Sequence, residues 1–157
     1  MTFIELLGAL QGTYPVELLR GANHLVIEIT EVVHVLGLVG LLTAVLLLSL
    51  RLLGVALPSL PSATLARAVA PLLWGGLAAT LITGTLLFLS GPVRYYANAA
   101  FGPKMVLLAL ALVAQALLYR RVVAAPEPGP VVARSGAALL LALWFGVGLC
   151  GRAIGYI

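Results

Sequence analysis

Four long apolar runs, separated by short polar stretches, dominate the pattern of the chain. They cover residues 27–50, 68–90, 104–119 (extended to 123) and 134–155. Most of these runs reach the roughly 20 residues that a helix needs to cross a hydrocarbon layer about 30 Å thick, and the third reaches it in its extended form. The pattern predicts an all-α integral membrane protein whose four spanning helices pack as a four-helix bundle.

A shorter apolar segment precedes these runs. Residues 2–12 are too few to cross a membrane, and they predict a short interfacial helix with Thr2 as its N-cap and Gly12 near its end. An acidic residue interrupts the segment and no basic stretch precedes it, so we do not expect a cleaved signal peptide. The chain therefore divides into an interfacial N-terminal segment, residues 1–20, and a single four-helix transmembrane domain, residues 21–157.

Prolines and small residues predict where the helices begin and end. The second spanning helix is expected to begin near Leu65, with turn and cap supplied by Pro61 and Ser62 before it. Pro71 then falls early enough to be a first-turn proline or the site of a kink. Residues 93–98, between the second and third runs, are expected to form a short interfacial loop with tyrosines at the headgroups.

The composition excludes several classes of protein. The chain is 62% hydrophobic and 9% charged, whereas about a quarter of the residues of a soluble domain are charged. The net charge of +4 is spread over the helix ends without a basic cluster, so no nucleic-acid partner is expected. The single cysteine, Cys150, cannot form an intramolecular disulfide.

The distribution of Lys and Arg predicts the orientation. The two loops that follow the first and third runs hold five arginines, and the opposite side holds four Lys or Arg residues. The bias sharpens if Lys104 and Arg152, on the opposite side, are there for function. Because cytoplasmic loops carry the excess of positive charge, we expect a multi-pass protein of the bacterial inner (cytoplasmic) membrane with both termini on the non-cytoplasmic side.

Equal spacings suggest that the chain consists of two similar halves. Each half has a basic or imidazole side chain near the start of one helix, arginine at its end, and a late glycine in the next helix. Steps of 17 residues join His34 to Arg51, Lys104 to Arg121, Arg67 to Gly84 and Arg134 to Gly151. Two pseudo-symmetric hairpins would bring His34 and Lys104 to the same depth. A spacing of 17 residues would also arise without any repeat, because all four helices cross a membrane of the same thickness.

A polar stripe marks the start of the first run. His24, Glu28, Glu31 and His34 follow one another at steps of four, three and three, so all four fall on one side of a helix. Such a stripe is costly in lipid and should face protein, a cofactor or a wet cavity. His34 would lie within the apolar layer, whereas His24 would lie at or outside the headgroups.

The residues of the stripe favour a haem site. In a low-dielectric site His34 could ligate haem iron, non-covalently because no Cys-x-x-Cys-His motif exists. The second iron ligand would be Lys104, Met105, water, nothing, or a histidine of a second protomer. The alternative for His34 is an interhelical hydrogen bond. Small residues would make room for a macrocycle or for close helix packing: Gly37, Gly40, Gly75 and Gly76.

Other polar residues have candidate roles around this site. Arg94 and Arg152 are suited to haem propionates. Glu31 could orient the imidazole of His34 or relay protons, or instead form an ion pair at a helix end. His24 and Glu28, one helical turn apart, could hold a surface metal ion.

Several stretches carry a resemblance to known families. They include His34-Val-Leu-Gly-Leu-Val-Gly, Thr83-Gly-Thr-Leu-Leu-Phe88 and Phe101-Gly-Pro-Lys104. Over about residues 20–157 the chain resembles an uncharacterised family of small bacterial four-helix membrane proteins. More distantly it is similar to the HemJ-type protoporphyrinogen oxidases and to the membrane domain of CopD copper-resistance proteins. The HemJ resemblance implies haem b, with His34 and Lys104 as the functional pair.

These observations predict a membrane haem b protein that transfers electrons between a quinone or partner protein and an acceptor. One alternative is a cofactor-free anchor or structural subunit of a larger membrane complex. Another is an enzyme like protoporphyrinogen oxidase, which would make the protein an oxidoreductase. Membrane lipid is the expected surrounding in each case, and a homodimer or larger membrane complex is compatible with all three.

Overall fold

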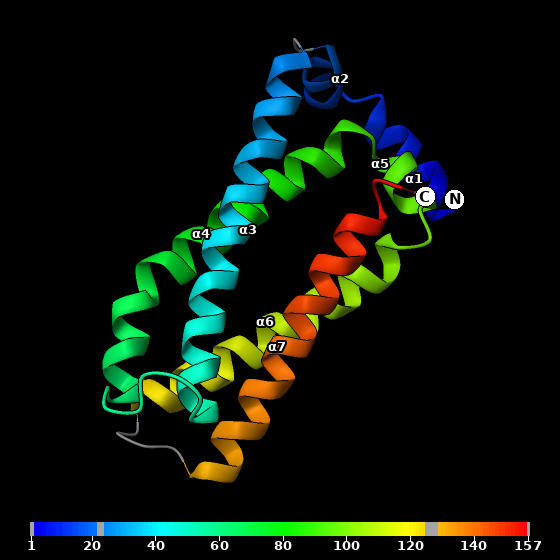
Figure 1. The fold of residues 1–157 in the computed structure, drawn as a ribbon. Coiled ribbons are helices and arrows are strands. Elements are labelled where there is room, and N and C mark those ends of the chain that lie inside the picture. The colour runs from blue at the N-terminus through cyan, green and yellow to red at the C-terminus, as the bar shows by residue number, and fades with distance from the viewer. Residues whose placement is uncertain (1, 22–23, 125–128, 157) are drawn as a thin grey trace.

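The computed structural model describes residues 2–21, 24–124 and 129–156, and within these ranges it contains helices and no strand (Figure 1). The all-α fold expected from the sequence is confirmed. The helices are α1 (Phe3–Gln11), α2 (Tyr14–Gly21), α3 (His24–Leu53), α4 (Ser62–Ser90), α5 (Pro92–Ala97), α6 (Phe101–Ala124) and α7 (Pro130–Ala153).

The four long helices are the membrane spans that the apolar runs predict. Helices α3, α4, α6 and α7 have 30, 29, 24 and 24 residues, and each is long and apolar enough to cross a membrane. Many of their outward-facing side chains are large and apolar, among them Leu36, Val39, Val113 and Leu139. In a bilayer these side chains contact lipid. The chain is thus a multi-pass membrane protein.

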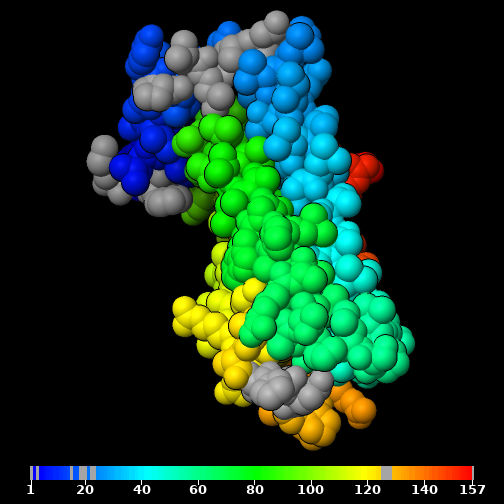
Figure 2. All heavy atoms as spheres, turned by 90° about the vertical axis from the view of Figure 1, so that its left-hand side faces the viewer, coloured from blue at the N-terminus to red at the C-terminus, as the bar shows by residue number. Residues whose placement is uncertain are grey.

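The spans form a closed ring of four helices, as Figure 1 shows. Each helix packs beside its partner in a hairpin, α3 with α4 and α6 with α7, and the ring is closed by contacts of α3 with α7 and α4 with α6. This is the four-helix bundle expected from the sequence. Helices α1 and α2 lie at one end of the bundle, where α1 contacts α5 and α2 contacts α4 (Figure 2).

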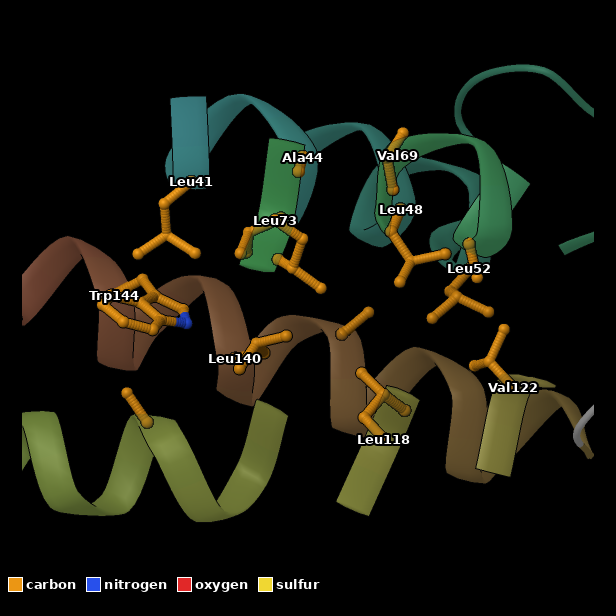
Figure 3. Close-up of a cluster of buried hydrophobic side chains, with 14 of the residues drawn as sticks. Leu41, Ala44, Leu48, Leu52, Val69, Leu73, Leu118, Val122, Leu140 and Trp144 are labelled. Carbon is orange, nitrogen blue, oxygen red and sulfur yellow. The ribbon is translucent and has the colours of Figure 1, made fainter. Parts of the chain in front are cut away.

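The hydrophobic core occupies the half of the bundle nearer the α3–α4 and α6–α7 connections. All described buried residues of α3 lie between Gly37 and Leu52, and those of α6 begin at Ala111. Figure 3 shows Leu48 of α3 and Trp144 of α7 among the side chains that meet there. Among the described residues, the other half of the bundle, which holds the first turns of α3 and α6, has no comparable core.

Glycines let α3 and α4 approach closely. A Cβ added to Gly76 would lie 2.7 Å from the carbonyl oxygen of Gly37 and 2.7 Å from the backbone nitrogen of Leu41, and one added to Gly40 would lie 3.0 Å from Leu72. These glycines therefore serve helix packing. The expectation that they make room for a macrocycle is wrong, because the partner helix fills that space. A Cβ at Gly75 would meet nothing within 4 Å.

The two hairpins repeat the same contact in the same register. A Cβ built on Gly84 of α4 would lie 3.0 Å from Cε1 of His34 on α3. A Cβ built on Gly151 of α7 would lie 3.5 Å from Nζ of Lys104 on α6. His34 and Lys104 therefore occupy equivalent positions in the two hairpins, and so do Gly84 and Gly151. In each hairpin a nitrogen-bearing side chain near the start of one helix lies against a late glycine of the next.

Three local predictions can be compared with the structure. Thr2 caps α1 as expected: its Oγ1 accepts a hydrogen bond from the Glu5 backbone (3.3 Å), and its own backbone N–H donates to the Glu5 carboxylate (2.8 Å). Helix α4 begins at Ser62 rather than near Leu65, and Pro61 is its N-cap, so Pro71 lies inside the helix.

The predicted loop over residues 93–98 is wrong. Residues Pro92–Ala97 form the short helix α5, because Pro92 at its first position has a backbone angle already suited to a helix and lacks the N–H that would be left unpaired there. This helix matters for the site, since it brings Tyr95 to the end of the bundle where the core stops.

Candidate functional site

A cavity of about 700 Å³ takes the place of a core in the half of the bundle where α3 and α6 begin. It is lined by residues of all four spanning helices and of α5, and most of them are apolar. Leu77, Trp144 and Val147 belong both to the buried core and to the cavity wall, so they separate the two. The volume lies within the range of about 300–1,000 Å³ that is usual for ligand pockets.

His34 lies on the wall of this cavity. Its ring is half-buried, and Nδ1 lies 3.0 Å from the hydroxyl oxygen of Thr83 on α4. The Cε1 edge of the ring faces Gly84, where a Cβ would come within 3.0 Å. Two neighbouring residues of α4 therefore fix the position of the imidazole, one by a hydrogen bond and one by the absence of a side chain.

Lys104 lines the same cavity from the first turn of α6. Its side chain lies beside Gly151 of α7, where an added Cβ would lie 3.5 Å from Nζ. In the described part of the chain no carboxylate forms an ion pair with Lys104. The cavity thus contains a half-buried ammonium group whose charge is not neutralised by any acidic side chain of the described residues.

Three more predicted residues line the cavity. Glu31 lies one helical turn before His34, and Met105 follows Lys104 in the chain. Arg152 of α7 is the third, and its guanidinium group lies 4.5 Å from the ring centroid of Tyr156 and donates a hydrogen bond to the hydroxyl of that tyrosine. Glu31 and Arg152 are both exposed, so they mark the part of the wall that is open to the surroundings.

Aromatic rings form one wall of the cavity. Phe88 of α4 and Phe101 of α6 are nearly parallel, with ring centroids 5.4 Å apart and an interplanar angle of 12°. Tyr95 of α5 lies beside both rings, 6.4 Å from Phe88 and 6.3 Å from Phe101 between centroids. Arg94, predicted as a propionate partner, does not line the cavity. Its guanidinium group lies 5.1 Å from the Tyr95 ring centroid.

The polar stripe of α3 is divided by the cavity. Glu31 and His34 line it, whereas His24 and Glu28 are exposed and do not. The first turns of α3 extend past the cavity, because a 30-residue helix is about 45 Å long. In the ranges that the structure describes, no group of three or more His, Cys, Asp or Glu residues could hold a metal ion. The surface metal at His24 and Glu28 stays a prediction.

Several residues of the site were not identified from the sequence. Thr83 is the most important, since Thr83-Gly84-Thr85 suggested only a patch of small residues that permits close packing. The 17-residue spacing pointed to Gly84 and Gly151 but not to their contacts with His34 and Lys104. The aromatic wall depends on α5, which the sequence did not predict as a helix. Rotation of α4 against α3 decides which hydroxyl meets the imidazole.

Comparison with known proteins supplies a family but no activity. The sequence model of a family of unknown function (DUF6644) matches residues 18–157. This agrees with the resemblance to an uncharacterised family, and it covers the four spanning helices. No curated protein and no solved structure matches the chain.

Proposed function

We propose that the protein, which belongs to a family of unknown function (DUF6644), binds haem b in its membrane cavity and transfers electrons. The observation that carries the proposal is the position of His34. Its ring is held by Thr83 and Gly84 on one side and lines an apolar cavity of about 700 Å³. A histidine nitrogen facing a largely apolar cavity is the usual arrangement for binding haem iron.

The charges around the cavity support an acidic ligand. Haem b carries two propionates, and such carboxylates need cationic partners when they leave water. Lys104 and Arg152 line the cavity and are suited to this role. Arg94, which lies against the Tyr95 ring, does not line the cavity. The chain thus offers an imidazole for the iron, apolar and aromatic walls for the macrocycle, and ammonium and guanidinium groups for the acids.

The chain offers one histidine for haem iron, and several groups could serve as a second ligand. His34 is the only histidine among the described cavity residues, and the other side chains there with a suitable donor atom include Lys104, Met105 and Tyr95. Glu31, exposed at the open part of the wall, would exchange protons between the cavity and the membrane surface. The nitrogen Nδ1 of His34 lies within hydrogen-bond distance of the Thr83 hydroxyl, so we expect Thr83 and not Glu31 to orient the imidazole.

Bound in this cavity, haem would supply a one-electron redox couple. The protein would hold the iron through His34, exclude water with the apolar wall and leave the Glu31 side accessible to a quinone or a partner protein. The distant similarity to HemJ-type proteins, in which the corresponding histidine and lysine are functional, supports the same pair. We place the protein in the bacterial inner membrane with both termini outside the cytoplasm, as the Lys and Arg distribution predicts.

The proposal is tested by the absorption spectrum of the purified protein. We expect a Soret band and sharp reduced α and β bands in the wild type, and their loss in His34→Ala. His24→Ala is the matched control, since His24 is exposed and outside the cavity, and it should keep the wild-type spectrum. A His34→Ala protein with an unchanged spectrum would overturn the assignment. Colourless wild-type protein that remains colourless after haem addition would do so too, and co-purifying subunits would then favour the cofactor-free anchor.

A further inference from the structure

The hydroxyl group of Thr83 has a single proton and three neighbours, which are two carbonyl oxygens of its own helix and the ring of His34. The carbonyl oxygen of Thr80 is the most distant of the three, at 3.4 Å from Oγ1. Thr83 is almost fully buried, and its Oγ1 lies 2.6 Å from the carbonyl oxygen of Ala79, one turn earlier in α4. The same oxygen lies 3.0 Å from Nδ1 of His34. A carbonyl oxygen only accepts, whereas an imidazole nitrogen donates or accepts according to the tautomer.

The short contact to the carbonyl decides where the proton goes. At 2.6 Å the hydroxyl must donate to Ala79, because two oxygens with only lone pairs between them would repel at this distance. The hydroxyl then presents a lone pair to His34, and the 3.0 Å contact is a hydrogen bond only if Nδ1 carries a hydrogen. A neutral imidazole carries one hydrogen, so Nε2 is left with a free lone pair.

From this we infer that Thr83 is a positioning residue that holds neutral His34 as the Nδ1–H tautomer, so that Nε2 is the atom that accepts a bond in the cavity. Gly84 supports the arrangement, since any side chain there would press on Cε1. Turning the ring over would bring a carbon atom to the Thr83 hydroxyl and lose the hydrogen bond. The lone pair on Nε2 serves iron if the proposed function is correct, and the tautomer itself does not depend on it.

The tautomer can be measured without haem. We propose nitrogen-15 NMR of the full-length chain, labelled at histidine, expressed under iron limitation and observed with the imidazole neutral. In the wild type, His34 should show a protonated Nδ1 and an unprotonated Nε2. Thr83→Ser keeps the hydroxyl and should give the same pattern. Thr83→Val removes it and should shift the population toward the Nε2–H form.

A matched control comes from the same helix as His34. Thr43 is exposed, and its hydroxyl donates to the carbonyl of Val39, one turn earlier, as Thr83 does to Ala79. It does not line the cavity, so Thr43→Val should leave the His34 spectrum unchanged. A wild type with Nε2–H, or a folded Thr83→Val protein with the wild-type pattern, would overturn the inference. The wild-type spectrum decides the first point even if Thr83→Val does not fold.

Haem titration of the same proteins separates this inference from the proposed function. If both are correct, Thr83→Val should bind haem at least about tenfold more weakly, as is usual when a partner of a metal-ligating histidine is removed. Thr83→Ser and Thr43→Val should bind as the wild type does. If no protein binds haem but the NMR pattern is as expected, the proposed function is wrong and the role of Thr83 stands. If His34 binds haem although the wild-type ring is Nε2–H, the proposed function stands and the role of Thr83 is wrong.

Discussion

The charge of Lys104 restricts the kind of ligand that suits the cavity. This residue places an ammonium group in a mostly apolar cavity, beside Gly151, and has no carboxylate partner in the part of the chain that is described. Partly buried charges in proteins are usually paired, because leaving water is costly. A ligand with an acidic group would supply the missing partner. Coordination of a metal by the neutral amine is the other role open to this side chain.

Replacement of Lys104 by Gln distinguishes these roles. As a counter-ion for a propionate, Lys104 should contribute about 1.4 kcal/mol, so Lys104→Gln should weaken haem binding about tenfold. Binding of the haem dimethyl ester, which has no acid, should not change. Arg121→Gln, at the exposed far end of α6, is the control and should bind both as the wild type does. Equal losses for haem and its ester would instead indicate that Lys104 acts at the iron.

Close packing of α3 on α4 holds the backbones of His34 and Thr83 in a fixed relative position. The two helices meet where Gly37 and Gly76 allow backbone contact, and the hydrogen bond from His34 to Thr83 lies about two turns further along. Helices approach this closely in membranes when small residues line the interface. The glycines are therefore required for the helix pair, and the geometry at His34 follows from the pair.

Two adjacent glycines test this interface. A methyl group at Gly76 would lie 2.7 Å from backbone atoms of α3, whereas one at Gly75 would meet nothing within 4 Å. We expect Gly76→Ala to lower the free energy of unfolding in detergent by about 1–3 kcal/mol, as overpacking usually does. Gly75→Ala should change it by no more than about 0.5 kcal/mol. Equal effects of the two substitutions would show that α3 and α4 do not cross at Gly76.

The whole molecule has a packed half and a hollow half. The core fills the bundle near the α3–α4 and α6–α7 connections, and the cavity lies near the end that holds α1, α5 and the last turn of α7 (Figure 1). Both termini lie at this end. If the arginine-rich helix ends beside the α3–α4 and α6–α7 connections face the cytoplasm, the cavity belongs to the non-cytoplasmic half of the membrane.

Cysteine labelling in intact cells tests this orientation. Cys150 is first replaced by Ala, and a new cysteine is introduced at exposed Thr13, between α1 and α2, or at exposed Ser59, between α3 and α4. A maleimide that does not cross the inner membrane should label Thr13→Cys and should label Ser59→Cys only after the membrane is permeabilised. The opposite pattern would reverse the orientation and move the cavity to the cytoplasmic half.

The spans, their order and the cap at Thr2 could be predicted from the sequence, because they depend on hydropathy and on residues close together in the chain. It also identified His34 and Lys104, since polar residues in apolar runs stand out wherever they point. The short helix α5 and the start of α4 were not predicted correctly, because turn and helix preferences over a few residues are nearly balanced.

Which of these residues share a site followed only from the packing of the helices in the bundle. It brought Glu31, His34, Lys104, Met105 and Arg152 to one cavity and left His24, Glu28 and Arg94 outside. The structure also showed that Gly37, Gly40 and Gly76 serve the packing of α3 on α4, and that Thr83 lies within hydrogen-bond distance of the His34 imidazole. The physical reason is that these contacts depend on the rotation and crossing of helices that are far apart in the chain, which no local pattern records.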